Sequence, residues 1–377
     1  MPLAAARKSS TNPYTALGLR PVINFQGPVT TVGASKMLPE IQAVMAEAAR
    51  DFAVLEEVKD AVGARIAKLC GTEAALVTTG CAGAIALGTY ACVAGSDAAK
   101  IRRLPDVTGM KSEVVIQKVH RNGYDHAVRS AGVRIVEVES AEQFANALSA
   151  KTAMIYFLGG QRGDWKIETP ISLEAMLPVA KKAGVPVLID AANMQPPWGS
   201  IPKLAATGID LIAFSGGKHI RGPQSSGVLA GRKDLIDAAW LNSSPHSDSN
   251  GRAMKVNKEE MIGLLHAIER YATLDFAAMD RECERQAAYL MAACEKIGLQ
   301  TAKAPFDRTR RVHRVLVSWD EAKRGRTAAQ VVKQLMNGEP RIAVLRNPNG
   351  QGLEFTFMMN DAGDEKLAAK RLREIFG

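Results

Sequence analysis

The sequence has few aromatic residues and no closely spaced cysteine pair. Aromatic residues make up 5% of the 377 residues, and no basic block interleaved with aromatics, as in many RNA-binding domains, is present. No two cysteines form a C-x-x-C pair, so neither a zinc site nor a redox motif is indicated, and we expect no metal. Their helical, alanine-rich surroundings predict buried, reduced thiols in a cytoplasmic protein. The five cysteines are Cys70, Cys81, Cys92, Cys283 and Cys294.

The chain also lacks a convincing membrane span. The stretch from Ala74 to Ala94 carries no charge, but glycine and threonine interrupt it, which favours a buried strand followed by a buried helix. The N-terminus has basic residues without the apolar segment of a secretory signal. We therefore expect no contact with a membrane.

The composition is that of a well-packed globular enzyme. Hydrophobic residues make up 47% of the chain and charged residues 23%. The net charge of +9 is spread along the whole sequence, which disfavours nucleic-acid binding. An anionic substrate and a merely solvated basic surface both remain compatible with this charge.

Short apolar, β-branched runs alternate with helical segments such as Ser172–Ala183. Strands buried on both faces have this composition, so the pattern predicts an α/β fold with a mostly parallel central sheet. The expected strands are Ala74–Thr78, Glu113–Lys118, Arg134–Val138, Ala153–Leu158, Val185–Asp190, Leu211–Phe214 and Gly227–Ala230.

Breaks in the pattern predict three parts. Prolines and glycines make residues 1–30 an irregular N-terminal arm, and residues 31–250 form the large domain. A polar stretch from Ser243 to Gly251 places the boundary. Residues 251–377 then contain a long linking helix, from Lys258 to about Ile297, and a small α+β C-terminal domain.

Lys218 is the most informative residue. An apolar run, Asp210–Phe214, leads into Ser-Gly-Gly-Lys218, and more glycines follow. A lysine in an apolar, glycine-rich site loses solvation, which lowers its pKa and makes the free amine nucleophilic. The alternative is a solvated surface lysine. Chain order favours the first interpretation, because a phosphate-type turn and an aspartate precede the lysine in the order that pyridoxal phosphate (PLP) enzymes use.

Asp190 ends a second apolar strand. Ligands of open α/β sheets bind at the carboxyl ends of the strands, and a buried carboxylate there needs a cationic partner. The protonated ring nitrogen of PLP would be such a partner, whereas the alternative is a helix N-cap or a structural ion pair. Asn193 would reach the phenolic oxygen of the cofactor.

A strand-to-helix turn at Gly80 provides the third element. Small residues let the backbone approach closely, and the free amides of Cys81 and Ala82 at a helix N-terminus favour a phosphate. Many glycine-rich helix starts serve only packing. Ser215, three residues before Lys218, would donate to the same phosphate.

His120 follows the expected strand 113–118 and would lie at the same edge of the sheet, where a flat side chain can stack on the cofactor ring. Tyr124 and His126 are alternatives, and so is a structural role for His120.

These segments resemble the fold-type I PLP enzymes of the aspartate aminotransferase superfamily. More narrowly, they resemble the group that contains selenocysteine synthase and D-glucosaminate-6-phosphate ammonia-lyase. The resemblance covers about residues 20–375. It rests on Pro21–Gly27, Leu55–Val58, Thr79–Ala84, Asp190–Asn193 and Ser215–Gly227.

The resemblance implies a fold-type I PLP-dependent transferase fold, with Lys218 forming the Schiff base and Asp190 pairing with the ring nitrogen. It also implies a homodimer or higher homo-oligomer, with Arg221–Ser226 as the cross-subunit loop. The chain departs from many relatives because its last strand lacks the arginine that grips the substrate carboxylate. The arginines that would replace it are Arg346, Arg221 and Arg162.

We therefore predict a PLP-dependent lyase. It would act on a small hydroxylated, anionic amino acid or amino-sugar acid and release a 2-keto acid and ammonia. The alternatives are an amino-acid racemase or epimerase, an aldolase, a selenocysteine synthase-like transferase, and a non-catalytic PLP- or tRNA-binding protein.

Overall fold

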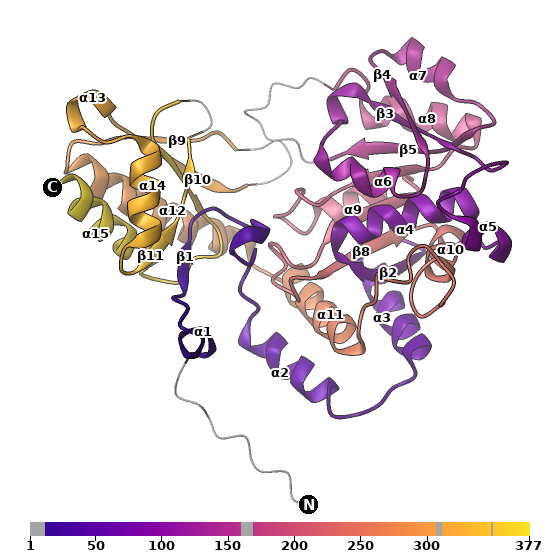
Figure 1. Ribbon diagram of the computed structural model, residues 1–377, viewed down its shortest axis with the longest axis horizontal. Helices are drawn as coiled ribbons and strands as arrows, with labels where there is room; N and C mark the ends of the chain where they lie inside the picture. The colour runs from indigo at the N-terminus through magenta and orange to yellow at the C-terminus, as the bar shows by residue number, and fades with distance from the viewer. Residues whose placement is uncertain (1–11, 160–168, 307–310, 348–349) are drawn as a thin grey trace, which may run out of the picture. The chain divides into compact units, whose positions relative to one another are not determined.

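The computed structural model describes residues 12–159, 169–306, 311–347 and 350–377 (Figure 1). The chain divides into two compact units. The larger is built mainly from Gly33–Phe276, and the smaller from the described parts of Met1–Val32, Ala277–Ala304 and Val312–Gly377.

A seven-stranded sheet in the order β2-β8-β7-β6-β5-β3-β4 forms the centre of the larger unit. Only β8 runs against its neighbours β2 and β7, and the other pairs are parallel. The predicted α/β fold with a mostly parallel sheet is confirmed. The strands are β2 (Ala74–Thr79), β3 (Glu113–Gln117), β4 (Arg134–Val138), β5 (Thr152–Leu158), β6 (Val187–Asp190), β7 (Leu211–Ser215) and β8 (Ser226–Gly231).

Helices cover both faces of this sheet, because alternate strand residues point to opposite sides. Val187 and Ile189 join one apolar cluster, whereas Leu188 joins the other. The helices packed in the first cluster are α2 (Pro39–Ala48), α3 (Leu55–Cys70), α7 (Ala141–Ala147), α8 (Leu173–Ala183), α9 (Ser200–Ala205) and α11 (Lys258–Ala272). Those packed in the second are α4 (Gly80–Ala94), α5 (Ala98–Arg103), α6 (His126–Arg129) and α10 (Lys233–Leu241).

Helix α4 is almost completely buried, as its uniformly apolar sequence predicts. It packs on the sheet with its first residue, Gly80, directly after β2, so the chain turns from strand to helix without a loop. The chain between β3 and β5 adds the short elements η2 (Lys118–His120), η3 (Gly123–Asp125) and α7 (Ala141–Ala147).

The smaller unit contains an antiparallel sheet in the order β12-β13-β10-β9. One face of this sheet packs against three helices, α12, α14 and α15, which lie beside it in Figure 1. The elements are β9 (Gln300–Lys303), β10 (His313–Ser318), β12 (Leu345–Arg346), β13 (Leu353–Phe357), α12 (Phe276–Glu295), α13 (Glu321–Arg324), α14 (Ala328–Asn337) and α15 (Asp364–Phe376).

Two sequence predictions about this part of the chain were wrong in detail. The N-terminal arm is not wholly irregular, since it contains α1 (Pro13–Ala16) and the strand β1 (Val22–Asn24). Strand β1 pairs in parallel with β11 (Arg341–Ala343), more than 300 residues away. The single predicted linking helix is two helices, because α11 ends at Ala272 and α12 begins at Phe276.

Helix α11 packs within the larger unit, whereas the sequence grouped it with the C-terminal part. The domain limits at residues 30 and 250 stay a prediction. Among the described residues, no helix combines the length and apolar character that crossing a membrane requires.

Candidate active site

The predicted site residues gather at one edge of the central sheet. Strand β6 ends at Asp190, β7 ends at Ser215, and β2 ends at Thr79, just before α4. Since β8 runs in the opposite direction, it begins at this same edge, where Gly227 lies opposite Ser215. The carboxyl ends of parallel strands are where open α/β sheets bind ligands.

The start of α4 lies directly against the start of β8. A Cβ atom on Gly227 would come within 2.2 Å of the Gly80 carbonyl carbon and 2.6 Å of the Cys81 nitrogen. Only glycine fits there. The side chain of the N-cap residue Thr79 makes no capping hydrogen bond, so the amides of Cys81 and Ala82 keep their capacity to bind an anion.

Lys218 lies in a loop that folds back on the turn before β8. The Gly216 amide donates to the Ser226 carbonyl (3.0 Å), and a Cβ atom on Gly217 would lie 2.4 Å from the Gln224 Cα atom. This close approach explains the glycine before Lys218. The Lys218 ammonium donates to the Asn193 side-chain oxygen at 3.1 Å, so the structure brings these two predicted residues together.

Asp190 is buried, with 5% of its surface exposed, and three groups donate to its carboxylate. The Tyr156 hydroxyl donates to Oδ2 at 2.9 Å. The Ala192 amide at 3.0 Å and the Cys81 thiol at 3.4 Å donate to Oδ1. Burial, followed by the charge of Asp190, raises the pKa of the Cys81 thiol well above its ordinary value, so the thiol stays protonated and remains a donor.

His120 is completely buried, and its ring packs edge-on against Phe157 with the centroids 4.5 Å apart. Burial lowers the pKa of His120 to about 4, so the imidazole is neutral near pH 7. The Leu158 amide donates to Nδ1 at 3.3 Å, which places the proton on Nε2. Nε2 is buried and has no hydrogen-bond partner among the described residues.

The loop that carries His120 is held by Asp125, which is 1% exposed. Arg121 Nε lies 2.5 Å from one carboxylate oxygen of Asp125, and Arg129 Nε lies 3.0 Å from the other. Burial opposes ionisation of Asp125, but these hydrogen bonds outweigh it and keep its pKa below the ordinary value. The alternatives Tyr124 and His126, which flank Asp125 in the chain, are both exposed.

The three candidate substrate arginines have different surroundings. Arg221 adopts a left-handed backbone conformation (φ 60°), and its Nε donates to the Lys36 carbonyl at 2.8 Å. Arg346 is exposed on β12 of the smaller unit, opposite Leu353. Arg162 lies outside the described residues. Their role in substrate binding stays a prediction.

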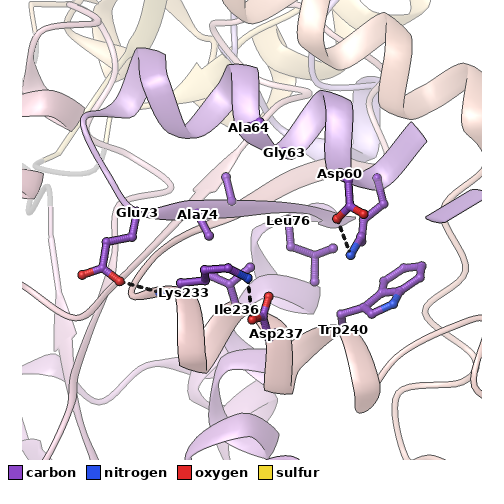
Figure 2. A pocket seen from close by; sticks show the side chains of 12 residues that line it. Asp60, Gly63, Ala64, Glu73, Ala74, Leu76, Lys233, Ile236, Asp237 and Trp240 are labelled. Atoms are coloured by element: carbon purple, nitrogen blue, oxygen red, sulfur yellow. Dashed lines mark hydrogen bonds and ion pairs between the residues drawn. The ribbon is translucent and has the colours of Figure 1, made fainter. Parts of the chain in front are cut away.

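A hollow of about 170 Å³ lies elsewhere in the larger unit, between α3, the first half of β2 and α10 (Figure 2). Its charges pair with one another: the Lys233 ammonium lies 2.7 Å from Asp237, and Lys59 Nζ lies 2.6 Å from Asp60 and 5.0 Å from the Trp240 ring centroid. The hollow borders Ala74, at the end of β2 remote from Gly80. It is therefore not the predicted cofactor site.

Comparison with known proteins places the chain in a family. The family model of the class-V aminotransferases matches residues 140–344. The chain belongs to this family. Its relatives include a D-glucosaminate-6-phosphate ammonia lyase from Salmonella typhimurium, 30% identical over 97% of this chain and 98% of the relative. A solved structure of D-glucosaminate-6-phosphate ammonia-lyase superposes with a TM-score of 0.83, at 28% identity, over 97% of this chain and 98% of that one.

A second relative has a different chemistry. A 5'-C-glycyluridine monooxygenase-decarboxylase from a Streptomyces species is 32% identical over 89% of this chain and 84% of its own length. An L-seryl-tRNA(Sec) selenium transferase from Geobacter metallireducens is 26% identical, over 68% of this chain and 58% of the transferase.

Membership of the class-V aminotransferase family makes this chain a fold-type I, PLP-dependent enzyme, as the sequence predicted. The described residues fit the cofactor. Uncapped amides at Cys81 and Ala82 suit a phosphate, the buried Asp190 carboxylate suits a cationic ring nitrogen, and the Lys218 amine suits an aldehyde.

The individual roles assigned from the sequence stay predictions, although the structure places Asp190, Asn193, Ser215, Lys218 and the Gly80 turn at one edge of the sheet. Sequence reasoning missed Tyr156, which occupies an apolar strand and gives no motif. Its position on the same face as Asp190 follows from the strand register, which the sequence alone does not show.

Proposed function

We propose that this enzyme is an ammonia-lyase that converts a hydroxylated, anionic amino acid or amino-sugar acid into a 2-keto acid and ammonia. One observation carries the proposal. A D-glucosaminate-6-phosphate ammonia lyase aligns with nearly the whole chain in sequence, and a solved structure of such an enzyme superposes on nearly the whole chain. The net charge of +9 agrees with a substrate that carries a carboxylate and a phosphate.

The bound cofactor would supply an electron sink that stabilises negative charge at the substrate Cα atom. Lys218 Nζ would then move the Cα proton, since its loop is fixed by the Gly216–Ser226 hydrogen bond. Asp190 would hold the proton on the ring nitrogen. The predicted stacking of the neutral His120 ring on the cofactor would require the ring, which is completely buried beside Phe157, to become accessible. In the net reaction the β-hydroxyl leaves as water, and a second water releases ammonia.

The reaction class can be tested on purified enzyme with D-glucosaminate 6-phosphate in deuterium oxide. We expect equal amounts of ammonia and a 2-keto acid that carries deuterium, without consumption of oxygen. Serine and unphosphorylated glucosaminate, which lack the phosphate, serve as controls for the need for this second anionic group. Recovery of deuterated, stereochemically inverted substrate without ammonia would instead identify a racemase or epimerase.

The relative from Streptomyces supports a second candidate, an oxidative decarboxylation of an amino acid attached to a nucleoside. The same assay separates the two, because this reaction would consume oxygen and release carbon dioxide. Incubating the enzyme with 5'-C-glycyluridine under air and under nitrogen is the direct test. Oxygen-dependent release of carbon dioxide from this compound would replace the lyase proposal.

We also propose that the enzyme is a homodimer. The loop between α2 and α3 presents Phe52 fully exposed and Val54 with 60% of its surface exposed. Adjacent exposed apolar side chains of this size are typical of association surfaces. Since fold-type I relatives are expected to pair, a second copy of the chain is the natural occupant.

The dimer can be tested with Phe52→Asp, which would place a charge in the interface. We expect wild-type enzyme to sediment as a dimer and the variant to dissociate at least tenfold more readily, about 1.4 kcal/mol. Tyr289→Asp, at a half-exposed position on α12, is the control and should remain dimeric. A wild-type monomer with full activity would contradict the proposal.

A further inference from the structure

Tyr156 and Asp190 lie on the same face of neighbouring strands. Tyr156 pairs in register with Leu188, and Leu158 pairs with Asp190, so both side chains point toward the face that α4 covers. The amino end of α4 brings Cys81 to the same carboxylate. Together with the Ala192 amide, these two side chains hold the Asp190 carboxylate by three hydrogen bonds.

The Tyr156 hydroxyl is a permanent donor. Tyr156 is completely buried, and its burial, together with the adjacent Asp190 charge, raises its pKa far above the ordinary value. The Asn122 amide bonds to the same hydroxyl, and its Nδ2 also donates to the His120 carbonyl at 3.0 Å. The phenol oxygen therefore accepts one hydrogen bond from Asn122, and the hydroxyl donates one to Asp190.

We infer that Tyr156, with the Cys81 thiol as a second donor, is a positioning residue that holds the Asp190 carboxylate in place so that the cofactor's ring nitrogen stays protonated. The inference rests on the proposed role of Asp190 toward PLP. Two protonation states compete in a buried carboxylate–pyridine pair, one charge-separated and one neutral. Burial favours the neutral state, in which the ring has lost its proton. Donors to the carboxylate stabilise the charge-separated state more than the neutral one, and so favour a protonated ring nitrogen.

The ring nitrogen can be observed directly in holoenzyme loaded with PLP that is ¹⁵N-labelled in the ring. In wild-type enzyme we expect the ¹⁵N resonance of a protonated pyridine. In Tyr156→Phe, which removes only the hydroxyl, the resonance should move toward the unprotonated position. We expect kcat to fall about tenfold while KM changes less than twofold, because the substrate contacts are untouched.

Tyr271→Phe is the matched control. Tyr271 is also buried in the larger unit, but its hydroxyl has no hydrogen-bond partner among the described residues. Removing it should change neither the resonance nor kcat. An unchanged ¹⁵N resonance in Tyr156→Phe would overturn the inference, even if kcat fell, because the loss would then be only structural.

If Tyr156→Phe does not fold, Cys81→Ala tests the same carboxylate from its other oxygen. A smaller shift in the same direction is expected, and Cys81→Ser, which restores a donor, should reverse it; no difference between these two variants would refute the inference. Failure of the underlying site assignment looks different. In that case Asp190→Asn would leave the resonance unchanged, or borohydride would not attach PLP to Lys218.

Discussion

Lys218→Ala should lose the covalent bond to PLP and most of its turnover. The amine is both the attachment point and the proposed group that moves the Cα proton, and loss of a general acid–base group alone costs about 10²–10⁴-fold in rate. Borohydride treatment of wild-type holoenzyme should fix the cofactor to the peptide containing Lys218, as detected by mass spectrometry, and the variant should show no labelled peptide.

Lys218→Arg is a suitable companion variant. It keeps the positive charge and can still donate to the Asn193 side chain, but it offers no amine that can condense with an aldehyde. Both variants should therefore be unlabelled and inactive. Labelling of another lysine in either variant, with turnover retained, would show that the attachment site had been misassigned.

Asp190→Asn should bind PLP but turn over about 10²–10³ times more slowly, which is the usual cost of losing one electrostatic contact in the transition state. The substitution keeps the size of the side chain, so the fold and the predicted phosphate contacts at α4 should persist. Steady-state kinetics at saturating PLP measure the loss, and the visible absorption of the protein confirms that the cofactor is bound.

Asp210→Asn is the matched control for this experiment. Asp210 directly precedes β7, at the opposite edge of the same sheet, and bonds to Arg232 at 2.9 Å and to the Val187 amide at 2.8 Å. Its replacement should lower stability without lowering kcat. Near-normal turnover of Asp190→Asn would mean that this carboxylate serves the fold and not the chemistry.

The central sheet was predictable because each buried strand is a short apolar run between turn residues. The expected ranges 134–138 and 74–78 match β4 and nearly match β2. Chain order was also sufficient to bring Gly80, Asp190 and Lys218 to one edge, since parallel strands place their carboxyl ends together.

Contacts that depend on strand register were not predictable. Nothing local in the sequence says that Tyr156 lies one strand away from Asp190 and on its face, because the register of parallel strands is fixed by packing over the whole sheet. The pairing of β1 with β11 joins segments from opposite ends of the chain, so no local pattern could reveal it. The same holds for the Tyr156–Asn122 contact.

The antiparallel strand β8 has a consequence for how the enzyme matures. It is the last strand of the large sheet along the chain, yet it lies between β2 and β7 and completes the backbone around Gly80. The predicted cofactor site would therefore be incomplete in a nascent chain that ends before Gly231, although the Gly80 turn has already been synthesised. PLP should bind only the finished large unit, and a ligand that binds only the native state stabilises it in proportion to RT ln(1 + [PLP]/Kd). The supply of PLP would then influence how much folded enzyme a cell retains, in addition to how much of it is active.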